Sequence, residues 1–95
     1  MNATLILRHK DVSPEGWLTE MVIWHVPDPV YPSVHLFKYS LVLIVNDERV
    51  IGFDNERGKG DHYHHDGDDS PYAFTGLENL VDDFIEEVER WKSEH

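Results

Sequence analysis

Residues 36–45 read Leu-Phe-Lys-Tyr-Ser-Leu-Val-Leu-Ile-Val, and this stretch decides the fold. Every second side chain from Phe37 to Val45 is aromatic or aliphatic, which is the period of a β-strand with one buried face. The intervening positions begin polar and end apolar. The segment is therefore predicted to be a central strand whose Phe37 face lies in the core.

Further strands are predicted on both sides of this segment. Asn46-Asp47-Glu48 has the composition of a tight hairpin turn and leads into a strand over Arg49–Asp54. Upstream, Ala3–Asp11 alternates in polarity, and Trp17–Val26 is rich in β-branched and aromatic residues. Between them, Ser13-Pro14-Glu15-Gly16 has Pro and Gly at the positions that a type I turn favours. These segments predict an antiparallel β-meander.

Three segments lack a clear strand or helix pattern. The prolines of Pro27–Ser33 predict a loop, because proline cannot donate to a sheet ladder. Residues 55–69 hold almost no apolar side chain and three glycines, which also predicts a loop. Pro71–Phe74 is expected to be a short extended piece.

The C-terminal segment is predicted to be one amphipathic helix over Gly76–Glu94. Thr75 and Glu78 have the spacing of a capping box, and acidic side chains occupy the face opposite the apolar stripe. The stripe follows the 3.6-residue period at Leu77, Leu80, Val81, Phe84, Ile85, Val88 and Trp91. The fold class is therefore α+β: a single domain, residues 1–95, with a meander of four to five strands packed on one C-terminal helix in two layers.

Composition and charge bound the function. The chain has 95 residues and a formal net charge of −11. It has no cysteine, which excludes a disulfide scaffold, thiolate metal sites and a cysteine nucleophile. Residues 61–95 hold eleven acidic and two basic side chains, so this part favours a basic partner or a solvated acidic helix face. The N-terminal apolar run is too short for a signal peptide, and no segment is long enough to span a membrane, so we expect a cytoplasmic protein.

The second predicted strand carries two tryptophans on opposite faces. Trp17 and Trp24 are seven residues apart, so one of them is expected in the core. The other is expected on the open face beside Val22, Val42 and Ile44. That apolar surface has two interpretations. It is an interface with a partner or with a second copy of the chain, or it is covered by the loop around Val30–Val34.

The segment Asp54–Asp69 holds the residues that could carry chemistry. Gly58 and Gly60 flank Lys59, with Arg57 beside them, so flexible backbone and two cations occur together. If the chain after Gly60 is extended, His62 and His64 project to one side and Tyr63 and His65 to the other.

Three readings of this segment remain open. The first is metal-independent phosphodiester cleavage, in which His62 and His64 act as acid and base while Arg57 and Lys59 hold the phosphate. The second is a metal site built from His62, His64, Asp61 and Asp66. The third is a structured loop with no catalysis. The isolated His9, His25 and His35 are expected to be sheet-surface histidines or histidines with satisfied hydrogen bonds, rather than ligands.

The run Gly52–His65, with its core Asp-Asn-x-x-Gly-Lys-Gly-Asp-His at residues 54–62, resembles the TumE family of small prokaryotic toxins. The resemblance extends to the strand Phe37–Leu41 upstream and to Pro71–Phe74 and the acidic helix downstream, so it covers nearly the whole chain. It implies a toxin component that a helix-turn-helix antitoxin, encoded beside it, neutralises. The positions that match the family's signature are Asp54, Asn55, Arg57, Lys59, Asp61, His62 and His64.

The resemblance thus implies a toxin of a type II toxin–antitoxin system, for which we expect RNA or the ribosome as the target and no cofactor. His62, His64, Arg57 and Lys59 are the expected catalytic residues, and Asp54, Asn55, Asp61 and Tyr63 the expected binding residues. The alternative is a non-catalytic protein-interaction or metal-binding module.

Overall fold

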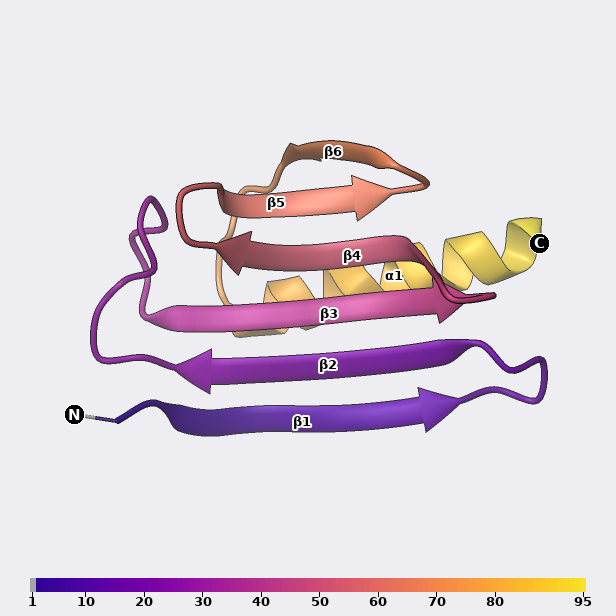
Figure 1. The fold of residues 1–95 in the computed structure, drawn as a ribbon, viewed down its shortest axis with the longest axis horizontal. Coiled ribbons are helices and arrows are strands. Elements are labelled where there is room, and N and C mark those ends of the chain that lie inside the picture. Colours follow the sequence, from indigo (N-terminus) through magenta and orange to yellow (C-terminus); the bar gives the residue numbers. More distant parts are fainter. Residues whose placement is uncertain (1) are drawn as a thin grey trace.

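The computed structural model describes residues 2–95 as one antiparallel sheet with a single helix on one face (Figure 1). The strands are β1 (Thr4–Val12), β2 (Leu18–His25), β3 (Phe37–Val45), β4 (Glu48–Glu56), β5 (Gly60–His65) and β6 (Asp68–Pro71), and the helix is α1 (Leu77–Glu94). The strands lie in chain order from β1 to β6, each antiparallel to its neighbour. The predicted two-layer α+β meander is confirmed.

The strand count differs from the prediction of four to five. Residues 55–69 do not form a loop: they complete β4, form β5 and begin β6. The turns between these strands hold Gly58 and Gly67 at φ 88° and 91°, in the left-handed region that glycine tolerates without strain. The two additional strands are polar on both faces, which is why apolar periodicity did not predict them.

The core lies between β3, β4 and α1. Leu41, Leu43 and Ile51 are completely buried against the helix, and the helix contributes four of the seven residues in its predicted stripe. Those four are Leu80, Phe84, Val88 and Trp91. Of the other three, Leu77 and Val81 are partly buried and Ile85 is exposed. Burial of this stripe is what places α1 across the middle of the sheet rather than at its edges.

The predicted capping box is wrong. The helix begins at Leu77 with Gly76 at the N-cap, and no side chain caps it. The Thr75 hydroxyl instead accepts a hydrogen bond from the Asn79 side chain at 2.9 Å. Gly76 has φ 135° and ψ 163°, so the chain enters the helix in a conformation that places Thr75 outside the capping position.

The sheet face opposite α1, called the open face below, is toward the viewer in Figure 1, and no other part of residues 2–95 crosses it. The two predicted tryptophan positions are confirmed. Trp17 meets Trp91 edge to face at 5.1 Å on the helix side, and the strand register places Trp24 on the open face between β1 and β3. Within residues 2–95, no helix is long and apolar enough to cross a membrane.

Candidate active site

Strands β4 and β5 divide the predicted site residues between the two faces of the sheet. Asp54 lies directly opposite His62 in the strand register, and both face the open side, as does His64 two residues on. Asn55, Asp61 and Tyr63 alternate with them and face the helix side. The prediction that His62 and His64 share a side is confirmed.

Asp54 and His62 form a close pair. Nε2 of His62 is 2.7 Å from Oδ1 of Asp54, and the side chains are only 13% and 11% exposed. The other ring nitrogen, Nδ1, lies 3.1 Å from the carbonyl oxygen of Gly60. A carbonyl oxygen can only accept, so this contact is a hydrogen bond when Nδ1 carries the ring hydrogen. The ring of His62 is thus held between the Gly60 carbonyl group and the Asp54 carboxyl group.

The contact between His62 and Asp54 is not a well-aligned hydrogen bond. Oδ1 of Asp54 is buried and has no donor at good hydrogen-bonding geometry, although Nε2 of His62 is close to it. Burial raises the pKa of Asp54 above its ordinary value, while the positive charges of His62 and Arg49 act in the opposite direction. A carboxyl group with a raised pKa beside a histidine is typical of acid–base sites.

Arg49 is a site residue that the sequence did not reveal. Its Nη1 lies 3.3 Å from Oδ2 of Asp54, so the two carboxyl oxygens face different partners, Arg49 and His62. Arg49 reaches Asp54 by lying over Gly52, where an added Cβ would come within 3.0 Å of the Arg49 Cδ. A glycine inside a strand often marks such a close approach, and this was the available signal.

His64 is engaged separately from this pair. Its Nδ1 donates to Oδ1 of Asp69 at 2.9 Å, and its Nε2 accepts from the backbone N–H of Gly67 at 3.3 Å. The hydrogen bond from His64 lowers the pKa of Asp69. His64 thus uses both ring nitrogens to hold the β5–β6 turn.

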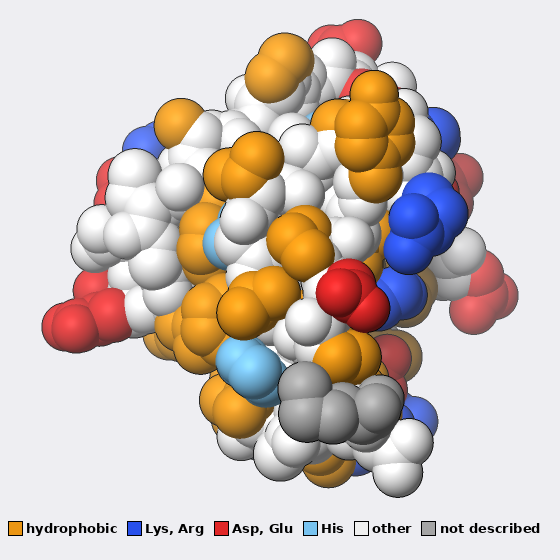
Figure 2. All heavy atoms as spheres, turned by 90° about the vertical axis from the view of Figure 1, so that its left-hand side faces the viewer, with side chains coloured by type: hydrophobic (Ala, Val, Ile, Leu, Met, Phe, Trp, Pro, Cys, Tyr) orange, Lys and Arg blue, Asp and Glu red, His pale blue; other side chains and the backbone are white. Residues whose placement is uncertain are grey.

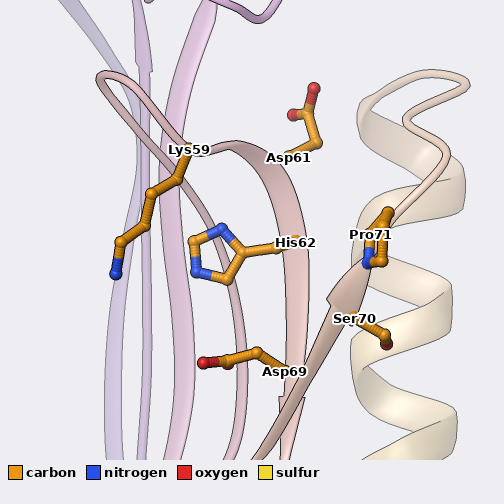
Figure 3. A pocket seen from close by; sticks show the side chains of 6 residues that line it. All are labelled: Lys59, Asp61, His62, Asp69, Ser70 and Pro71. Carbon is orange, nitrogen blue, oxygen red and sulfur yellow. The ribbon is translucent and has the colours of Figure 1, made fainter.

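The two expected phosphate ligands lie at the β4–β5 turn but face different hollows. Lys59 lines a hollow of about 310 Å³ together with His62 and Asp69, and Figure 3 shows these three side chains on the same side of β5. Arg57 lines a separate hollow of about 450 Å³ with Lys38. Of the two cations, Lys59 is therefore the one beside His62.

Asn55 and Asp61 belong to a polar cluster on the helix side. Asp61 accepts hydrogen bonds from Ser33 at 3.0 Å and Tyr39 at 2.6 Å, and its Oδ1 also contacts Nε2 of His35 at 2.7 Å. Asn55 is 1% exposed and bonds the backbone of Phe37 and Tyr39 where the β3–β4 ladder ends. These contacts tie the β2–β3 loop to the sheet.

Tyr63 points toward α1. Its hydroxyl donates to Glu87 at 2.9 Å, and burial together with this carboxylate raises its pKa. Tyr63 therefore joins the sheet to the helix rather than facing the hollow beside His62. Within residues 2–95, no group of three or more His, Asp or Glu side chains has a geometry that could hold a metal ion.

The structure thus places His62 and Lys59 at one hollow, which Asp61 also lines, and it pairs His62 with Asp54 and Asp54 with Arg49. No curated protein and no solved structure matched the chain. A family model described as Toxin TumE matches residues 2–92, which is nearly the whole sequence and includes every residue of the site. The chain belongs to the TumE toxin family.

Proposed function

We propose that this toxin acts in a type II toxin–antitoxin system and inhibits growth by metal-independent cleavage of RNA at the Asp54–His62 pair. Membership of a toxin family implies an antitoxin partner in general. The more specific proposal is a helix-turn-helix antitoxin protein encoded beside the toxin, in the cytoplasm. The observation that supports the chemistry is the buried contact of 2.7 Å between Nε2 of His62 and Oδ1 of Asp54.

The proposed reaction is attack by a ribose 2′-hydroxyl on the adjacent phosphodiester. The 2′-oxygen bonds to phosphorus, the bond from phosphorus to the 5′-oxygen breaks, and the 5′-oxygen gains a proton. The Asp54–His62 pair supplies that proton, and the proton lost from the 2′-hydroxyl restores the pair through solvent. Lys59, which lines the same hollow as His62, is the cation available to the charged phosphate.

The site separates the roles first predicted for His62 and His64. His62 has the buried carboxylate partner, whereas His64 has both ring nitrogens engaged within the β5–β6 hairpin. We therefore assign acid–base chemistry to His62 and a supporting role to His64. Asn55, Asp61 and Tyr63 are assigned to holding the sheet, loop and helix together.

Inducible expression in a bacterial host tests this proposal. Wild-type protein should arrest growth and degrade RNA, co-expression of the adjacent gene should relieve the arrest, and His62→Ala should abolish it. His64→Gln is the matched control because it lies on the same strand and face, and it should retain activity. A folded His62→Ala protein that remains fully toxic would disprove the assignment.

The alternative function is a non-catalytic interaction protein. The observation that favours it is that the ring nitrogens of His62 are also engaged, by Gly60 and Asp54, so that neither is free in this arrangement. Under this alternative, His62→Ala lowers the melting temperature and weakens inhibition together, and purified protein leaves RNA intact. A homodimer formed through the open face is a further expectation, which sedimentation of the purified protein tests.

A further inference from the structure

The cations of this acidic protein are unevenly distributed in space. Six of its eight Lys and Arg residues lie outside α1. The strand register and the Arg49–Asp54 contact assign four of them to the open face, Arg8, Lys10, Lys38 and Arg49, and Arg57 and Lys59 occupy the β4–β5 turn. Helix α1, on the other side of the sheet, carries seven acidic and two basic side chains.

The view from the end of the molecule shows the same division. Figure 2 looks at the end where the β2–β3 loop and the β4–β5 turn lie, and Lys and Arg gather mainly on its right-hand side, which corresponds to the open face. Acidic side chains accompany them on that face, namely Glu20, Asp54, Glu56 and Asp69. The open face is therefore close to neutral, whereas the helix layer is strongly negative, so a polyanion approaching the protein is directed to the open face.

Trp24 gives this face an aromatic surface. It lies between Leu5 of β1 and Lys38 of β3 and is not part of the buried core. Its side chain is partly exposed, so part of the indole ring is accessible from the open face. An aromatic ring beside cations on an open sheet is a surface on which unpaired bases can stack.

The position of Trp24 relative to the candidate active site fits an extended polynucleotide. Trp24 is on β2 and His62 is on β5, three strand spacings apart, which is about 14 Å across the sheet. Lys38 and Ser40 of β3, both exposed, lie between them on the same face. A polynucleotide that crosses the sheet from Trp24 would pass these two side chains and then β4, where Asp54 and Glu56 face the same side, before it reaches the hollow beside His62.

We propose that the open face binds single-stranded RNA, with a base stacked on Trp24, a phosphate near Lys38 and the next part of the chain directed to His62. This proposal rests on the proposed function, because it names the substrate of that site. The bases of a duplex are already paired and stacked, so unpaired nucleotides are the form of RNA whose bases can stack on Trp24.

Binding is measured separately from cleavage. A fluorescently labelled single-stranded RNA with 2′-O-methyl riboses cannot be cut by the proposed reaction, so its anisotropy reports binding alone. Wild-type protein should bind it, Trp24→Ala should weaken binding about tenfold, and Lys38→Glu should weaken it severalfold more at low than at high salt. Trp17→Phe is the matched control, because Trp17 lies on the helix side, and it should bind like the wild type.

Each outcome decides between the two proposals. The proposal that the open face binds single-stranded RNA is overturned if wild-type protein does not bind this RNA or binds an RNA duplex equally well. It is also overturned if both Trp24→Ala and Lys38→Glu leave RNA binding unchanged. Loss of antitoxin binding rather than RNA binding in these variants also overturns it. RNA binding that depends on Trp24, without cleavage that depends on His62, supports the RNA-binding open face and refutes the proposed chemistry. Cleavage that depends on His62 but not on Trp24 supports the proposed chemistry and refutes the RNA-binding open face.

Discussion

At the scale of single residues, Asp54 lies in an environment that does not favour the ionised form of its carboxyl group. It is 8% exposed, and burial is the largest influence on its pKa, which is raised. A carboxylate in this state costs more free energy in the folded chain than in the unfolded one. Arg49 and His62 reduce that cost but do not reverse it. Such an arrangement is expected where a carboxyl group is kept for chemistry rather than for folding.

The first prediction is that Asp54→Asn retains or raises stability while it abolishes growth inhibition. Because the pKa of Asp54 is raised above 3.8 in the folded state, its stabilising contribution is complete below that value and is lost as pH rises through the folded pKa. The asparagine variant cannot ionise and escapes this loss. Thermal unfolding at about pH 4 and about pH 7 measures this effect. The melting temperature of the variant, relative to that of the wild type, should be higher at about pH 7 than at about pH 4.

Arg49→Met provides the control for that measurement. It removes one cation facing the Asp54 carboxylate but keeps a long apolar chain over Gly52. We expect it to lower stability at neutral pH, because the ionised carboxylate then has one partner fewer. A clear fall in melting temperature of Asp54→Asn at neutral pH would contradict the first prediction and make Asp54 a structural residue.

At the scale of secondary-structure elements, strands with an apolar face were predictable and strands without one were not. Burial of alternate residues defines β3, and the helical stripe identifies the four buried positions of α1. β5 and β6 are held by backbone ladders and polar side-chain contacts, such as that between His64 and Asp69, which leave no apolar pattern in the sequence. The pairing of Asp54 with His62 depends on the β4–β5 register, so it could not be found before these strands were recognised.

The second prediction concerns the β5–β6 hairpin. The hydrogen bond from His64 lowers the pKa of Asp69, so its contribution to the hairpin is present above the ordinary value of 3.8 and is lost as pH falls through the lowered pKa. Asp69→Asn should therefore speed amide hydrogen exchange in β6 at neutral pH, while growth inhibition persists. Asp68→Asn is the matched control, because Asp68 is exposed in the same strand. Equal exchange in both variants would contradict a supporting role for His64.

The third prediction concerns the packing of α1 on the sheet. Phe84 is 1% exposed and meets Phe53 edge to face at 6.2 Å, so Phe84→Ala should lower the free energy of unfolding by about 3–5 kcal/mol. Ile85 is the next residue and is 47% exposed, so Ile85→Ala should cost less than about 1 kcal/mol. Chemical denaturation of the two variants measures the difference. Similar losses in both would show that α1 is not anchored through the Phe84 face.

At the scale of the whole molecule, the two layers carry different surfaces. The exposed side of α1 is acidic, with Arg90 as an internal partner for Glu86 and Glu87. The open face of the sheet holds Arg8, Lys10, Lys38 and Arg49 together with Trp24 and the Asp54–His62 pair, and it is close to neutral. Under the two proposals above, the antitoxin and the RNA are recognised by opposite sides of one small domain. This difference between the layers makes the open face the less repulsive surface for a polyanion in a chain with a net charge of −11.

The last prediction is that the cognate antitoxin associates through the acidic layer and does so more slowly as salt rises. Charges exposed on α1 act at a distance and are screened by ions, so they affect the association rate more than the dissociation rate. Glu89→Lys, an exposed change on the helix, should slow association with the antitoxin. Asp28→Lys changes the charge equally in the β2–β3 loop and should have a smaller effect. Association rates that are the same at low and high ionic strength, or equal losses in the two variants, would show that the acidic helix does not guide the antitoxin and that its charge serves only to keep that surface solvated.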